Sequence, residues 1–123
     1  MNRAGDRERH QGYYGGTEIN GKWWKRYKRA GFFARGNGEY WIDDTGFCFR
    51  RTLTRHAFCI PFAQVVDIRL GRSHAGRWTL KGQMVKIIWR AGGRTLSSGF
   101  VLSRSERETD TIIAQLRLRS GLS

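Results

Sequence analysis

The sequence has no long apolar run. No stretch approaches the roughly 20 apolar residues that a membrane-spanning helix needs, and residues 1–21 lack the continuous apolar core of a signal peptide. These absences argue against a membrane-spanning or secreted protein. We therefore expect a cytoplasmic protein, either free or peripheral on the inner face of the membrane.

Cysteine is also scarce. Cys48 and Cys59 lack the CxxC spacing of a zinc or redox site, and two cysteines fall short of the density of a secreted disulfide scaffold. A four-residue connection at Thr54–Ala57 would set Cys59 opposite Thr52, too far from Cys48 to bridge. The pattern predicts two free structural thiols.

Signatures of catalysis are absent too. The acidic residues are isolated or lie in a predicted turn, as Asp43 and Asp44 do, and the histidines lack the spacing of metal ligands. No Gly-x-Ser-x-Gly motif surrounds Ser97 or Ser98, and a strand serine is expected to hydrogen-bond locally. We predict a protein that is not an enzyme, with no catalytic residue, no metal and no cofactor. The histidines are His10, His56 and His74.

Acidic residues number 10 against 23 lysines and arginines, which gives a formal net charge of +13. A field of this sign attracts anionic surfaces but does not choose among them. An acidic protein, an anionic phospholipid surface and nucleic acid are all candidate partners. Solubility alone would explain part of the charge.

The chain of 123 residues, 39% of them hydrophobic, can fill one core. Residues 1–21 are polar and glycine-rich and cannot bury enough apolar area to offset ordering, so they are predicted to form a flexible N-terminal arm. Residues 22–120 are predicted to form a single domain. Its parts are a basic aromatic segment (22–38), a barrel of strands (39–102) and a C-terminal helix (105–119).

Short alternating patterns predict β-strands from residue 39 onwards. The turn Asp43–Gly46 separates the first two strands, with Phe47 and Phe49 on one face. Gly92-Gly93 supports the positive φ values of a tight hairpin turn between the last two. Residues 71–82 are expected to form a long connection or a short irregular strand. The predicted strands are residues 40–42, 47–53, 58–62, 66–70, 85–90 and 96–102.

A helix is predicted after the last strand. Ser105 and Glu108 fit the capping box, in which the serine oxygen accepts an early helix N–H and the glutamate reaches back. Ile112, Ile113 and Leu116 then recur at helical spacing. The helix therefore has one apolar stripe to bury.

A basic aromatic segment without any acidic residue runs from Lys22 to Arg35. Drawn as a helix, it groups aromatic side chains on one side and basic ones on the other, a pattern suited to an anionic membrane surface. The alternative is that its tryptophans cap the barrel core and its lysines are solvated. The candidate anionic-surface residues are Lys22, Trp23, Trp24, Lys25, Arg26, Lys28 and Arg29.

A second tract without acidic residues runs from Ile68 to Ser105. If its strands are neighbours, its charges line one face of a sheet with aromatic groups at the edge, which suits phosphate contacts with base stacking. The alternative is a basic face that only keeps the protein soluble. The candidate residues of this basic face are Arg72, His74, Arg77, Trp78, Lys86 and Arg90.

The hairpin Tyr40–Arg51, the pattern of Ile60, Pro61, Val65 and Ile68, and the closing helix resemble the GRAM and pleckstrin-homology-like superfamily. The resemblance covers Gly38 to Arg119, and small bacterial members are the most similar. It implies a mainly β fold, a partly open antiparallel barrel capped by a C-terminal α-helix, which binds phosphoinositides, peptides or protein surfaces and rarely catalyses.

One departure concerns the loop Asp43–Gly46. Lipid-binding members cluster lysine and arginine in the first hairpin loop, and here the hairpin taken as the first carries two aspartates instead. The loop therefore argues against headgroup binding in the usual pocket.

Together these features predict a non-catalytic binding module that docks on an anionic protein or membrane surface. The alternative is a nucleic-acid-binding domain that uses the basic sheet face with aromatic stacking. Exposed barrel edges could in addition pair copies of the chain into a homo-oligomer.

Overall fold

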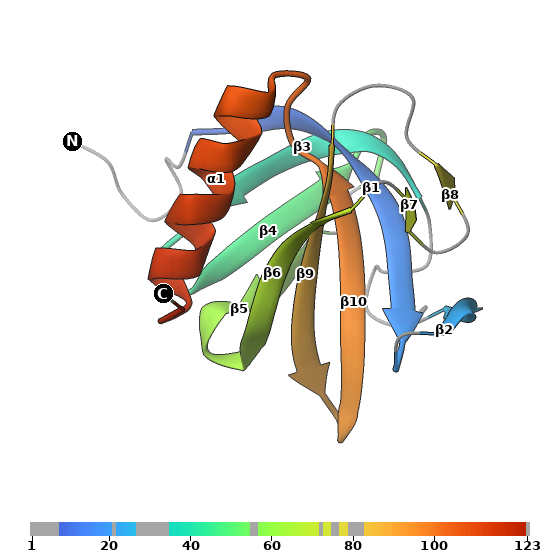
Figure 1. Ribbon diagram of the computed structural model, residues 1–123. Coiled ribbons are helices and arrows are strands. Elements are labelled where there is room, and N and C mark those ends of the chain that lie inside the picture. The colour runs from blue at the N-terminus through green and yellow to red at the C-terminus, as the bar shows by residue number, and fades with distance from the viewer. Residues whose placement is uncertain are drawn as a thin grey trace.

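A single antiparallel sheet forms most of the molecule (Figure 1). The computed structural model describes residues 8–20, 22–26, 35–54, 57–71, 73–74, 77–78 and 83–122, with the backbone alone for residues 23–24, 26, 73–74 and 77–78. The strands of the main sheet follow the order β5-β4-β3-β1-β10-β9-β6. They are β1 (His10–Ile19), β3 (Gly36–Ile42), β4 (Gly46–Arg51), β5 (Ala57–Pro61), β6 (Val65–Gly71), β9 (Met84–Ala91) and β10 (Arg94–Val101).

Three further strands lie outside this path. β2 (Lys22–Arg26) pairs with β1, whereas β7 (Ser73–His74) and β8 (Arg77–Trp78) pair with each other in a small separate sheet. A 3-10 turn, η2 (Phe62–Gln64), joins β5 to β6. The chain then ends in one helix, α1 (Glu106–Arg119).

The sheet is curved but not closed. β5 and β6 lie at its two ends and do not pair with each other, and α1 packs against β6. Figure 1 shows α1 along one side of the curved sheet. The predicted mainly β fold, a partly open barrel with a C-terminal helix, is confirmed.

The prediction of a flexible arm over residues 1–21 is wrong for β1. This strand is central to the sheet, between β3 and β10. Its glycines concealed it: Gly16 has φ +102° at a bulge between Tyr14 and Thr17 that breaks the alternation of a strand. A Cβ on Gly12 would lie 3.0 Å from the Tyr40 ring, so the missing side chain lets β1 and β3 pack closely.

Aromatic rings fill the core of the barrel. The buried ring of Tyr14 lies with its centroid 4.9 Å from that of Phe58 and 5.3 Å from that of Phe100. The faces predicted for Phe47 and Phe49 are confirmed, since both are buried in this core. Burying rings of this size contributes strongly to the stability of the barrel.

A buried polar chain crosses this core. The Tyr14 hydroxyl is hydrogen-bonded to Thr17 Oγ1 at 2.5 Å, and Thr17 Oγ1 to Ser98 Oγ at 2.7 Å. Trp89 Nε1 donates to the same Ser98 oxygen at 3.0 Å. Ser98 therefore joins β1, β9 and β10, so the expectation of a merely local hydrogen bond is incomplete.

The prediction of two free cysteines is wrong, because Cys48 and Cys59 form a disulfide. They are direct partners across β4 and β5, with their Cα atoms 4.1 Å apart. The predicted register failed because β4 ends at Arg51 and not at Leu53. The chain turns there, with Leu53 at φ +66° and the Thr54 N–H donating to Arg51 O at 3.1 Å.

Candidate functional site

Two basic connections of the barrel contact the same strand. One joins β1 to β3 and contains β2, and the other joins β6 to β9 and contains β7 and β8. β2 pairs with the end of β1, and β7 also contacts β1. Figure 1 shows β2, β7 and β8 on the side of the barrel away from α1. We call this side, with β2, β7 and β8, the insertion side.

The helix drawn for the basic aromatic segment is wrong over Lys22–Arg26, which is strand β2. Successive residues of a strand alternate between two faces, so the one-sided grouping expected of a helix does not apply there. Lys22 and Lys25 are exposed, and neither forms an ion pair with any residue that the structure describes. Lys28 and Arg29 lie outside the described residues.

The second set of candidate residues is only partly gathered. Lys86 and Arg90 lie on the outer face of β9, where Arg90 is exposed and donates to Thr95 Oγ1 at 3.0 Å. Arg69 of β6 lies opposite Lys86. Arg72 lies outside the described residues. For His74, Arg77 and Trp78 the backbone alone is described, in the β7–β8 hairpin.

The loop Asp43–Gly46, which was expected to be the first hairpin loop of the barrel, is not the first. Because β1 is the first strand of the barrel, the first connection runs from residue 20 to residue 35 and contains β2. The Asp43–Gly46 turn joins β3 to β4 and is the second connection. Asp43 has a structural role there: its Oδ1 accepts the N–H groups of Thr45 and Gly46, both at 2.9 Å. The two aspartates therefore give no argument against an anionic partner at the first connection.

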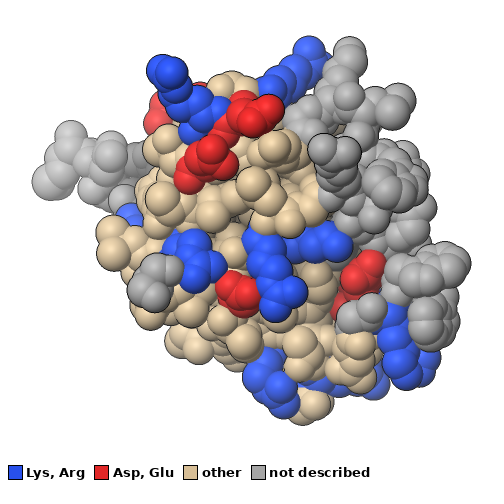
Figure 2. All heavy atoms as spheres, in the orientation of Figure 1, with Lys and Arg blue, Asp and Glu red and all other residues tan. Residues whose placement is uncertain are grey.

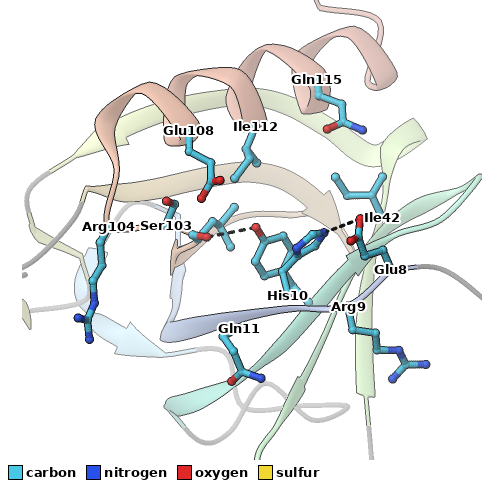
Figure 3. Close-up of a pocket in the computed structure, with 12 residues that line it drawn as sticks. Glu8, Arg9, His10, Gln11, Ile42, Ser103, Arg104, Glu108, Ile112 and Gln115 are labelled. Atoms are coloured by element: carbon cyan, nitrogen blue, oxygen red, sulfur yellow. Dashed lines mark hydrogen bonds and ion pairs between the residues drawn. The ribbon is translucent and has the colours of Figure 1, made fainter.

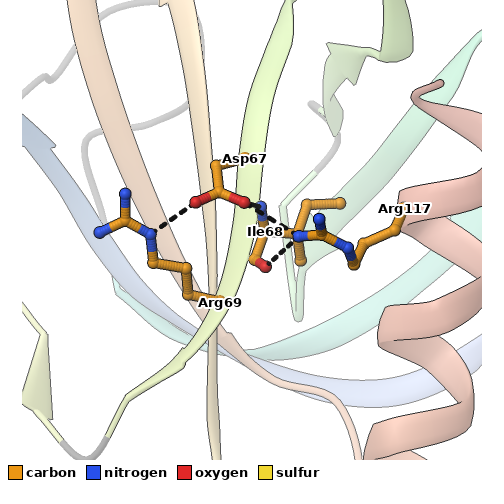
Figure 4. Close-up of polar contacts among 4 residues, drawn as sticks. All are labelled: Asp67, Ile68, Arg69 and Arg117. Atoms are coloured by element: carbon orange, nitrogen blue, oxygen red, sulfur yellow. Dashed lines mark hydrogen bonds and ion pairs between the residues drawn. The ribbon is translucent and has the colours of Figure 1, made fainter. Parts of the chain in front are cut away.

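Elsewhere, four arginines are paired internally, two by Asp67 and two by Glu39. Asp67 of β6 accepts a hydrogen bond from Arg69 Nε at 2.6 Å and one from Arg117 Nη1 at 2.9 Å (Figure 4). Arg117 also donates to Ile68 O at 3.0 Å, which ties α1 to β6. The hydrogen bond from Arg69, the largest influence, and that from Arg117 hold the pKa of Asp67 below its ordinary value despite burial.

Glu39 of β3 binds a second pair of arginines. Its Oε1 accepts from Arg50 at 2.6 Å and from Arg9 at 3.2 Å, and the Arg9 guanidinium lies 4.0 Å from the centre of the Trp41 ring. Burial raises the pKa of Glu39, but the hydrogen bonds from Arg50 and Arg9 outweigh it and hold the pKa below its ordinary value. Figure 2 shows acidic side chains interleaved with basic ones on the face that carries α1.

A cleft of about 720 Å³ opens between α1 and the start of β1 (Figure 3). Its apolar lining includes Ile42, Leu102 and Ile112, and its ring pair is His10 and Tyr40, with centroids 5.2 Å apart. The Tyr40 hydroxyl donates to Leu102 O at 3.1 Å. This is a cleft with a mixed polar and apolar lining, of the size that binds small molecules or single side chains.

The carboxylate of Glu108 faces this cleft. The predicted capping box is half confirmed: Ser105 Oγ accepts the Glu108 N–H at 3.2 Å, but Ser103 Oγ, at 3.0 Å, accepts the Ser105 N–H in place of the glutamate. Figure 3 shows Glu108 pointing from α1 towards His10. Burial, and to a smaller extent Glu108, raises the pKa of Tyr40 to about 12, as expected for a carboxylate near the phenol.

Sequence reasoning missed this cleft. Its residues come from the chain before β1, from the start of β1, from β3, from the chain after β10 and from α1. Glu8 and Glu108 are 100 positions apart, so no local motif connects them. The only signal was Glu108 itself, which the capping pattern explained in another way.

Within the described part of the chain, no three His, Cys, Asp or Glu side chains form a group that could hold a metal ion. There, too, no helix has the length and apolar character needed to cross a membrane, and α1 has 14 residues.

Comparison with known proteins identifies a family for this chain. A search of curated proteins gave no match. Among solved structures, the chain is similar to the C-terminal domain of an unknown protein from Leishmania infantum, with a TM-score of 0.49 and 15% sequence identity over 89% of this chain and 81% of the other. A family model described as bacterial PH domain-like matches residues 2–117, which include β1 and most of α1. The chain therefore belongs to the bacterial PH domain-like family.

Proposed function

We propose that this protein is a non-catalytic PH-like module that docks on an anionic protein or membrane surface through its insertion side. The observation that carries the proposal is the contrast in pairing. Lys22 and Lys25 of β2 are exposed without an ion pair among the described residues, whereas Glu39 and Asp67 pair arginines elsewhere. An exposed, unpaired lysine keeps its charge available for a partner.

The arrangement of the insertions supports this proposal. The stretch from Lys22 to Arg35 has no acidic residue and fills the connection between β1 and β3. The connection between β6 and β9 also lacks acidic residues, and its β7 contacts β1. Because β2 and β7 both contact β1, basic side chains on these two strands would meet the same anionic surface.

Co-sedimentation with vesicles of phosphatidylglycerol and phosphatidylcholine tests whether the protein docks on an anionic membrane. Each basic residue near an anionic membrane contributes about 1 kcal/mol, so replacing Lys22 and Lys25 by glutamine should weaken binding about 30-fold. The matched control replaces Arg107 and Arg119, two exposed arginines of α1, by glutamine. It removes the same charge and should change binding little. Equal losses in the two variants would show that only total charge matters.

Two parallel titrations distinguish the other partners. Binding of polyglutamate but not of vesicles would favour an acidic protein surface. Binding of a single-stranded oligonucleotide alone, with an affinity that falls steeply with salt, would favour the nucleic-acid alternative. No binding of any of the three polyanions at low salt would overturn the proposal.

A further inference from the structure

The cleft beside α1 differs in charge from the rest of this basic protein. Two carboxylates line it, Glu8 before β1 and Glu108 on α1. Two arginines line it as well, but Arg9 is bound to Glu39 and lies over Trp41. Figure 3 shows the guanidinium groups of Arg9 and Arg104 pointing away from the space between Glu108 and His10. The two carboxylates therefore line the cleft, whereas both guanidinium groups point out of it, and Glu8 Oε1 lies 3.7 Å from His10 Nε2.

The rest of the lining adds a planar surface and acceptors. His10 and Tyr40 present two rings inclined at 33°, and the side chains of Ser103 and Gln115 supply oxygen acceptors. A guanidinium is planar, weakly hydrated and carries five donors, so it can stack on rings while it donates to carboxylates and amides. An ammonium is more strongly hydrated and lacks the planar face.

We propose that this cleft binds the side chain of a single arginine from a partner polypeptide. The guanidinium would lie between Glu8 and Glu108, with its aliphatic stem against Ile42 and Ile112. The volume of about 720 Å³ also accommodates a short length of the partner's backbone.

The net charge of the protein restricts the partner further. At +13, the chain repels polybasic segments at long range. The cleft therefore selects an isolated arginine within a neutral or acidic segment. This site lies beside α1, away from the insertion side, so a partner bound in it could be held while the insertion side contacts an anionic surface. The proposal does not depend on that second contact.

Amide NMR of the full chain, titrated with an acetylated and amidated Gly-Ser-Arg-Ser-Gly peptide, tests the proposal. Saturable shifts are expected at Ser103, Glu108 and Gln115. The same peptide with citrulline, which is close in shape but neutral, should bind at least about fivefold more weakly. A lysine peptide should be intermediate. Shifts that avoid these residues, or equal affinity for arginine and citrulline, would overturn the proposal.

Two pairs of variants test whether the arginine peptide binds in this cleft. Glu108→Gln should weaken arginine binding about fivefold, whereas Glu106→Gln, which removes the same charge from the same helical turn, should not. Gln115→Arg should block the cleft, whereas Ala114→Arg adds the same charge to an exposed position outside the lining and should not. Equal effects within either pair would refute the assignment. Failure of vesicle binding would leave these results unchanged.

Discussion

Two carboxylates hold four arginines in ion pairs on the barrel and its helix, whereas the two described lysines of the insertion side have no such pair. On the strands, Glu39 pairs Arg9 and Arg50. Asp67 likewise pairs two arginines, one of them from α1. On the insertion side, Lys22 and Lys25 have no ion pair with a described residue. A paired charge contributes to internal structure, and an unpaired one remains available to a partner, so net charge alone says little about where a basic protein binds.

Stability and polyanion binding should therefore depend on different regions of the molecule. Changes within the barrel should lower stability and leave binding to polyanions unchanged, whereas changes on the insertion side should do the reverse. Three changes within the barrel should lower the free energy of unfolding by successively smaller amounts.

The largest effect is expected from the disulfide. Replacing Cys48 and Cys59 by serine should lower the free energy of unfolding by about 3 kcal/mol, because a short closed loop no longer restricts the unfolded chain. Urea denaturation measures the loss, and treating the unaltered protein with a thiol reductant should reproduce it. Vesicle affinity should remain within about twofold of the unaltered protein, since two removed side chains carry no charge. A large loss of vesicle affinity would contradict the expectation that the barrel affects stability alone.

The buried hydroxyl of Ser98 should come next. Ser98→Ala leaves Thr17 and Trp89 without their shared partner and should cost about 2 kcal/mol in urea denaturation. Ser97→Ala, at the neighbouring position on the opposite face of β10, is the control and should cost less. Equal costs would mean that the polar chain contributes nothing beyond ordinary strand packing.

The smallest effect is expected at Asp67. Asp67→Asn should cost about 1 kcal/mol at neutral pH, since its two arginine contacts are partly exposed. The folded pKa of Asp67 lies below its ordinary value of 3.8, so its contribution is present above that pH and is lost as the pH falls through the folded pKa.

Urea denaturation from pH 7 to pH 2 should therefore show a weaker acid dependence in Asp67→Asn than in the unaltered protein. Asp110→Asn, at an exposed position of α1, should keep the full dependence. If both variants behave alike, the link between β6 and α1 has no energetic role.

The sequence predicted those elements whose patterns are local. The hairpin around Asp43–Gly46, the Gly92-Gly93 turn and the helix after Ser105 all follow from turn, alternation and capping rules. β1 was missed because its glycines and its bulge at Gly16 hide the alternation. The disulfide was missed because the positive φ of Leu53 ends β4 early and shifts the register.

The site was harder to predict than the fold. The basic segments were visible as runs, but their common position beside β1 depends on how the barrel folds. The cleft depends on Glu8 and Glu108, which only the packing of α1 near the start of β1 brings together. Ion pairing also decided which basic residues stay available, and the partners of Asp67 lie 2 and 50 positions away.

The most direct test of the central claim is to map, by amide NMR, where the unaltered protein contacts an anionic bicelle containing phosphatidylglycerol. We predict that the largest changes fall in β2, from Lys22 to Arg26, and in the β7–β8 hairpin, with little change in α1. Changes centred on α1, or spread evenly over both sides, would contradict the account.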